Sequence, residues 1–86
     1  MYTVELKPKA CKFIKAQDAQ IKRQIMERIK SLANNPRPQN CRLLHSDEKL
    51  YRIRSGDYRI IYQISDSQKR VIIAWVDNRK DVYKGL

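Results

Sequence analysis

The chain has 86 residues, 42% of them hydrophobic, with only 2 Gly and 3 Pro, so it can bury one modest core and is neither disordered nor collagen-like. Its 19 Lys and Arg outnumber 9 Asp and Glu, which gives a formal net charge of +10. The basic residues divide almost evenly between the two halves of the chain, so this charge belongs to the folded body. Such a surface favours a polyanion or an acidic protein as partner.

The first half of the chain predicts one strand and two helices. Residues 2–7 alternate apolar and polar side chains, as in a strand with one covered face, and Pro8 ends this strand. Pro8 also suits the first turn of a short helix over residues 9–16. Asp18 can cap a second helix, which Asn34-Asn35-Pro36 should end. The apolar residues of this second helix fall on one stripe: Ile21, Ile25, Ile29 and Leu32.

The second half predicts four strands, over residues 41–44, 50–55, 58–65 and 70–76. The last of them is apolar on both faces, which places it inside the sheet, covered on at least one side by the helices. The predicted fold class is α+β: an N-terminal strand, a helical hairpin, and then a mostly antiparallel four-stranded twisted sheet with the helices on one face.

The sequence Tyr51–Tyr62, YRIRSGDYRIIY, predicts a hairpin with a two-residue type II′ turn at Gly56-Asp57. Counting outward from this turn places Arg54 opposite Arg59. The same count sorts two sets of residues onto opposite faces: Tyr51, Ile53, Ile60 and Tyr62 on one, and Arg52, Arg54 and Arg59 on the other.

Three arginines on one face of a hairpin need a physical explanation. Like charges directly opposite each other raise the free energy unless an anion lies between them. No acidic residue is available on the same strands to pair these side chains, so the pattern predicts an anion-binding surface. In the alternative interpretation, the guanidinium groups extend into water while their stems cover apolar surface.

Residues 77–83 follow the last predicted strand and are expected to fold back over the arginine face. They would add the guanidinium of Arg79 and the aromatic hydroxyl of Tyr83. Guanidinium groups beside an aromatic ring suit a nucleotide phosphate with its base stacked nearby, a combination typical of single-stranded RNA recognition.

The segment Leu50–Ile64, LYRIRSGDYRIIYQI, followed by Val71–Tyr83, VIIAWVDNRKDVY, resembles the RelE/ParE superfamily of bacterial and archaeal toxins. The resemblance covers nearly the whole chain and implies that residues 1–86 form a single RelE-like, microbial-RNase-like toxin domain. RelE-type members of this superfamily are ribosome-dependent endonucleases that cut mRNA in the ribosomal A site, and ParE-type members are gyrase poisons. ParE-type sequences generally lack the arginine and tyrosine set, so the resemblance favours the RelE type.

The resemblance also implies roles for single residues. Arg59 matches the arginine that stabilises the scissile phosphate, and Tyr83 matches the C-terminal tyrosine. The implied catalytic set is Arg54, Arg59, Arg79 and Tyr83, and the implied RNA-binding set is Arg52, Arg54, Arg59, Arg79 and Lys80. The chain departs from its relatives in three ways. It has arginine where lysine is usual on the first hairpin strand, His45 where relatives often have glycine in the loop before the hairpin, and Asp77-Asn78-Arg79 where many relatives have Gly-His-Arg. His45 is a weaker candidate for acid–base chemistry.

The function implied by this resemblance is ribosome-dependent mRNA cleavage through attack of the 2′-hydroxyl, with the ribosome, mRNA and a cognate acidic antitoxin as partners. No cofactor or metal is expected, because Cys11 and Cys41 lack C-x-x-C spacing and the chain has a single His. The sequence shows no signal peptide and no transmembrane segment, so a cytoplasmic location is expected. Two alternatives stay open: a ParE-like gyrase inhibitor without nuclease activity, and a non-catalytic nucleic-acid-binding domain.

Overall fold

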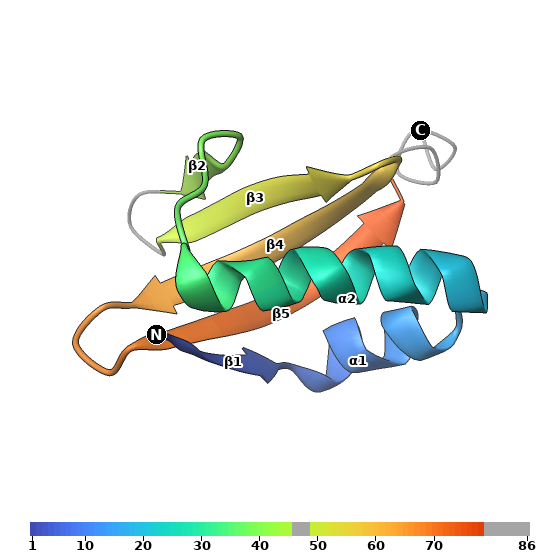
Figure 1. Ribbon diagram of the computed structural model, residues 1–86, viewed down its shortest axis with the longest axis horizontal. Helices are drawn as coiled ribbons and strands as arrows, with labels where there is room; N and C mark the ends of the chain where they lie inside the picture. The colour runs from blue at the N-terminus through green and yellow to red at the C-terminus, as the bar shows by residue number, and fades with distance from the viewer. Residues whose placement is uncertain (46–48, 79–86) are drawn as a thin grey trace.

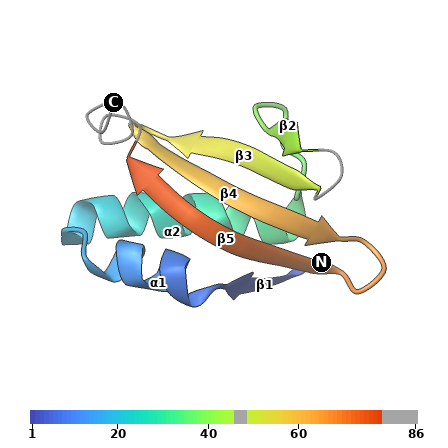
Figure 2. The same cartoon turned by 180° about the vertical axis from the view of Figure 1, so that it is seen from behind.

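A computed structural model of the chain, which describes residues 1–45 and 49–78, shows one sheet with two helices packed on one of its faces (Figure 1). The elements in chain order are β1 (Thr3–Leu6), α1 (Pro8–Lys15), α2 (Ala19–Asn34), β2 (Arg42–His45), β3 (Leu50–Ser55), β4 (Tyr58–Ser65) and β5 (Arg70–Asn78). The sheet is 5-stranded with the order β1-β5-β4-β3-β2. Seen from behind, β4 and β5 pass in front of α2 (Figure 2). The predicted α+β class is confirmed.

The N-terminal strand extends the predicted four-stranded sheet at one edge. β1 pairs with β5 in parallel, whereas the other three neighbouring pairs are antiparallel. β5 therefore has a partner on each side and lies inside the sheet, as its apolar sequence predicts. The pairing of these two strands could not be predicted from the sequence, because about sixty residues separate them in the chain.

Both helices follow their sequence signals. Pro8 stands at the start of α1, where its missing N–H leaves no hydrogen bond unmade. At the start of α2, the carboxylate of Asp18 accepts a hydrogen bond of 2.9 Å from the backbone N–H of Ile21. The apolar stripe of α2 faces the sheet, so Ile25 and Ile29 are buried. We call the side of the sheet that α1 and α2 cover the helix face, and the opposite side the open face.

The core lies between the helix face and the helices, and a β-bulge shapes it. Ile73 and Val76 of β5 are both buried in this core, although an odd spacing of three would place them on opposite faces of a regular strand. Tyr62 pairs with Ile73, whereas the preceding residue of β4 pairs with Trp75. Ala74 is thus an extra residue in β5 that reverses the alternation of faces.

The β3–β4 hairpin has the predicted register. Arg54 pairs with Arg59, and Ile53 pairs with Ile60. Gly56 has a φ of +62°, whereas the φ of Asp57 is not positive. This combination agrees with the predicted type II′ turn and excludes type I′, which needs positive φ at both central residues.

A polar cluster joins the N-terminal segment, the loop after α2 and the β4–β5 turn. Arg37, from the loop after α2, donates hydrogen bonds of 3.1 and 2.8 Å to the carboxylate of Asp66 in the β4–β5 turn. The hydroxyl of Tyr2 donates a further bond of 2.6 Å to Asp66. These bonds lower the pKa of Asp66 to about 2, and the hydrogen bond from Arg37 has the largest effect.

This cluster predicts that the free energy of unfolding falls at acid pH. The folded-state pKa of Asp66 lies below its ordinary value of 3.8, so its contribution to stability is complete above about pH 4 and is lost as the pH falls towards about 2. In urea denaturation at a series of pH values, the wild-type free energy of unfolding should fall more steeply over this range than that of Asp66→Asn. Glu27→Gln, at an exposed position on α2, is the control and should keep the wild-type slope. Equal slopes for wild type and Asp66→Asn would contradict the assignment.

The turn predicts a second effect on stability. A Cβ atom at Gly56 would meet nothing within 4 Å, so Gly56→Ala introduces backbone strain without a steric clash. We expect a loss of about 1–2 kcal/mol in the free energy of unfolding, measured by urea denaturation. Ser67→Ala, in the β4–β5 turn at a residue without positive φ, should leave it nearly unchanged. A fully stable Gly56→Ala protein would mean that the turn tolerates another conformation.

Candidate functional site

The candidate site lies on the open face of the sheet, which neither described helix covers (Figure 2). The hairpin register places Arg52, Arg54 and Arg59 on this face, as predicted. A fourth arginine joins them, because Arg42 of β2 pairs directly with Arg52 of β3. Arg42 and Arg54 are exposed, and Arg52 and Arg59 are half-buried. The open face therefore carries a basic surface across three neighbouring strands, which we call the arginine face.

Part of the arginine face is hollowed into a pocket of about 310 Å³. Arg42, Arg52 and Arg54 line it, together with Gln39, Asn40 and Cys41 from the loop before β2. Guanidinium groups bind phosphate oxygens through paired N–H donors, and side-chain amides can both donate to and accept from a base edge. In the part of the chain that the structure describes, no carboxylate pairs with Arg42 or Arg54. This pocket can thus hold a phosphate with part of a nucleotide.

The sequence analysis missed Arg42, Gln39 and Asn40 as site residues. The register between β2 and β3 could not be counted from the sequence, because it shifts at a bulge between Leu43 and His45.

Arg59 has an acidic partner, contrary to the expectation from the sequence. Its Nε and Nη2 donate hydrogen bonds of 2.8 Å each to Oδ1 and Oδ2 of Asp77. The two side chains are only 28% and 26% exposed. The sequence analysis placed Asp77 in a segment that follows the last strand. That placement is wrong, because β5 continues to Asn78 and pairs Asp77 directly with Arg59.

This ion pair also explains how the sheet tolerates the Arg54–Arg59 pair. The two arginines are directly opposite each other, which is unfavourable for like charges. Asp77 lies opposite Arg59 on the other side and supplies a compensating negative charge. The register of β5 depends on the bulge at Ala74, so the sequence alone could not reveal this contact.

Three predicted site residues, Arg79, Lys80 and Tyr83, lie outside the described residues, as does the side chain of His45. The structure therefore brings together Arg52, Arg54 and Arg59 from the predicted set and leaves the other roles as predictions.

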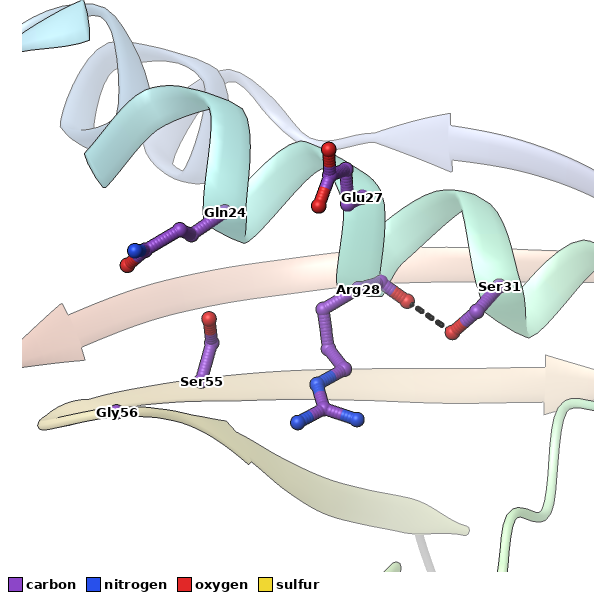
Figure 3. Close-up of a pocket in the computed structure, with 6 residues that line it drawn as sticks. All are labelled: Gln24, Glu27, Arg28, Ser31, Ser55 and Gly56. Atoms are coloured by element: carbon purple, nitrogen blue, oxygen red, sulfur yellow. Dashed lines mark hydrogen bonds between the residues drawn. The ribbon is translucent and has the colours of Figure 1, made fainter. Parts of the chain in front are cut away.

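Another pocket, of about 470 Å³, lies on the helix face instead. Its lining residues come from α2 and the end of β3: Gln24, Glu27, Arg28, Ser31, Ser55 and Gly56 (Figure 3). Arg28 points from α2 towards the sheet, and the hydroxyl of Ser31 donates to the carbonyl of Arg28 at 2.6 Å. This pocket contains none of the predicted arginines and mixes both signs of charge, so we place the candidate site on the arginine face.

Within residues 1–45 and 49–78, no three His, Cys, Asp or Glu side chains gather where they could hold a metal ion. Cys11 and Cys41 are free thiols, each half-buried rather than fully buried. No helix in this part of the chain is long and apolar enough to cross a membrane.

The fold and the arginine face define a small α+β domain with a basic surface on one face of its sheet. Residues 4–83 match a family model described as the ParE toxin of the parDE type II toxin–antitoxin system. The chain therefore belongs to this toxin family and to the RelE/ParE superfamily that its sequence resembles. A comparison with curated proteins gives no match.

Solved structures of RelE proteins are similar to this chain. The archaeal RelE–RelB complex from Pyrococcus horikoshii has a TM-score of 0.81 at 26% identity, covering 91% of this chain and 94% of that one. A RelBE toxin–antitoxin complex from Mycobacterium tuberculosis has a TM-score of 0.78 at 26% identity, covering 91% and 98%. The isolated RelE toxin of E. coli, at 22% identity, shares the fold with a TM-score of 0.78 and coverage of 99% and 94%.

The arginine face predicts the effect of removing Arg42. Arg42→Ala should weaken binding of a short single-stranded oligonucleotide and lower the salt dependence by about one counterion, because one phosphate contact is lost. Fluorescence anisotropy at several salt concentrations measures both quantities. Arg23→Ala removes the same charge from the exposed surface of α2 and is the matched control. An equal effect of both substitutions would mean that net charge alone, and not the pocket, binds the oligonucleotide.

Proposed function

We propose that this toxin is a ribosome-dependent endoribonuclease that cleaves mRNA in the ribosomal A site. The observation that carries this proposal is the arginine face: Arg42, Arg52, Arg54 and Arg59 gather on three adjacent strands of a domain that shares its fold with RelE toxins. A surface of this kind can bind the backbone of a single RNA strand.

The proposed reaction is attack of a 2′-hydroxyl on the adjacent phosphate. A bond forms between the 2′-oxygen and phosphorus, and the bond from phosphorus to the 5′-oxygen breaks. The 2′-hydroxyl loses a proton and the 5′-oxygen gains one, so a 2′,3′-cyclic phosphate and a 5′-hydroxyl result. Negative charge builds up on the phosphate oxygens in the transition state, where fixed guanidinium groups stabilise it most. We assign this role to Arg54 and Arg59, with Arg79 as a further contributor.

Arginine carries protons poorly, because it stays protonated at any physiological pH. In this proposal Tyr83 orients or deprotonates the 2′-hydroxyl, helped by the surrounding positive charge. The assigned set contains no histidine or glutamate, so much of the rate must come from holding the RNA in a reactive geometry. A ribosome that presents mRNA in one conformation supplies this positioning, which explains a dependence on the ribosome.

A cognate acidic antitoxin is the second proposed partner. The similar RelE structures from P. horikoshii and M. tuberculosis are complexes with their antitoxins. The net charge of +10 favours fast association with an acidic segment. An antitoxin that covers the arginine face would prevent RNA from reaching it.

One observation favours a second candidate function. The matching family model is named after ParE, and the sequence analysis connects ParE-type toxins with gyrase. A gyrase inhibitor would have no need of the arginine face for phosphate chemistry, so its toxicity should survive loss of Arg59.

Primer extension on mRNA, with and without translating ribosomes, tests the nuclease proposal. We expect new 5′ ends at in-frame codon positions only when ribosomes are present. Arg59→Ala should lower the cleavage rate by about a hundredfold or more, the effect of removing one charge-stabilising donor from a transition state. Arg23→Ala on α2 should cleave at the wild-type rate. In the same assay, unchanged cleavage by Tyr83→Phe would remove the role assigned to Tyr83.

The opposite outcome is also informative. If the protein arrests growth but produces no new mRNA ends, the nuclease proposal fails. Gyrase-linked DNA breaks that persist in the Arg59→Ala variant would then support the second candidate.

A further inference from the structure

The contact between Arg59 and Asp77 has the geometry of a phosphate complex. The Nε and Nη2 groups of Arg59 point at two oxygens of one planar anion, each at 2.8 Å. Guanidinium groups bind phosphate through the same pair of parallel N–H donors. The carboxylate of Asp77 therefore occupies a position that two phosphate oxygens would otherwise fill.

We propose that Asp77 is a specificity-determining residue that competes with phosphate for Arg59. This inference rests on the proposed function in one respect, namely that Arg59 binds the phosphate of RNA. In the free protein, Asp77 accepts from the Nε and Nη2 groups of Arg59. A ligand reaches the Nε–Nη2 edge of Arg59 only by displacing this carboxylate, so a weakly held anion or a loosely bound RNA strand is disfavoured at that edge. An RNA that is positioned by other contacts, including the pocket lined by Arg42 and Arg52, can exchange its phosphate for Asp77.

Burial strengthens this competition. Roughly three quarters of each side chain is shielded from solvent, so water screens the charge of Asp77 less than it would at an exposed site. A phosphate placed between Arg54 and Arg59 would lie close to this negative charge, because Asp77 is the direct neighbour of Arg59 on β5.

The alternative role for Asp77 is positioning, in which it holds Arg59 in the orientation that phosphate needs. The two roles predict opposite signs. Neutralising a competitor tightens phosphate binding, whereas neutralising a positioning residue weakens it. The geometry favours competition, since the two carboxylate oxygens of Asp77 already accept from the Nε–Nη2 edge of Arg59 that a phosphate would use.

The sheet offers a matched control for this test. Glu5 of β1 forms an ion pair with Arg70, at the opposite end of β5 from Asp77. These side chains are more exposed, at 48% for Glu5 and 40% for Arg70. Glu5→Gln changes the net charge of the protein by the same amount as Asp77→Asn, but far along the strand from the arginine face.

The test measures binding of a short single-stranded oligodeoxynucleotide, which lacks the 2′-hydroxyl and so reports affinity without cleavage. Asp77→Asn should bind about three- to fivefold more tightly than wild type, the size expected from removal of a partly exposed charge pair. Glu5→Gln should bind like wild type. In a double-mutant cycle, Asp77→Asn should not increase the oligonucleotide affinity in an Arg59→Ala background, because the guanidinium for which Asp77 competes is absent. Asp77→Glu keeps the negative charge, so its oligonucleotide affinity should be closer to that of wild type than to that of Asp77→Asn.

A second readout separates competition from a merely structural effect. The side-chain Nε–H resonance of Arg59 can be followed by NMR during titration with inorganic phosphate. In Asp77→Asn this resonance should shift at a lower phosphate concentration than in wild type, while the backbone spectrum stays that of the folded protein.

Three results would overturn the inference: equal or weaker oligonucleotide binding by Asp77→Asn, an equal gain from Glu5→Gln, or a gain that persists without Arg59. None of these measurements depends on RNA cleavage. A protein that fails to cleave mRNA but shows the Asp77→Asn gain would refute the nuclease proposal and keep the competition. A protein that cleaves mRNA but shows no gain from Asp77→Asn would keep the nuclease proposal and refute the competition.

Discussion

The two-residue turn at Gly56-Asp57 sets the register on which both faces of the sheet depend. Side chains alternate between the two faces of a strand, so a slip of one residue would move every side chain of β3 to the other face. With the observed register, Ile53 and Ile60 are buried beneath the helices, while Arg54 and Arg59 lie on the open face. A slip would place guanidinium groups in the core, at a cost of several kcal/mol for each buried charge. The hydrophobic core and the arginine face are thus two results of one constraint.

This arrangement places the main apolar core on one face of the sheet and the arginines on the other. The helix face contributes buried apolar area, which supplies most of the free energy of folding in a domain of this size. The open face gathers like charges at a cost, because Arg42 is opposite Arg52 and Arg54 is opposite Arg59. Natural proteins keep such unfavourable arrangements mainly where a ligand relieves them. A polyanion that binds the arginine face would relieve this repulsion and stabilise the toxin by mass action.

The ion pair between Arg59 and Asp77 shows how the free protein reduces this cost without a ligand. It neutralises one guanidinium and leaves Arg42 and Arg54 without a carboxylate partner among the residues that the structure describes. The bulge at Ala74 makes the contact possible, because it shifts the alternation of β5 so that Val76 remains in the core while Asp77 lies on the open face. One extra residue in β5 therefore links core packing to the electrostatics of the site.

Local signals in the sequence determined both helices, the cap at Asp18 and the hairpin register, because each depends on residues only a few positions apart. They also placed Arg52, Arg54 and Arg59 on one face, since counting from a two-residue turn leaves no freedom. Only the tertiary structure decided that β1 joins β5 in parallel, that Arg42 pairs with Arg52, and that Asp77 binds Arg59. These pairings depend on how separate strands dock and on a bulge that allows the core to pack. No count along the chain reveals them, because long-range strand pairing is set by the burial of the whole helix face rather than by neighbouring residues.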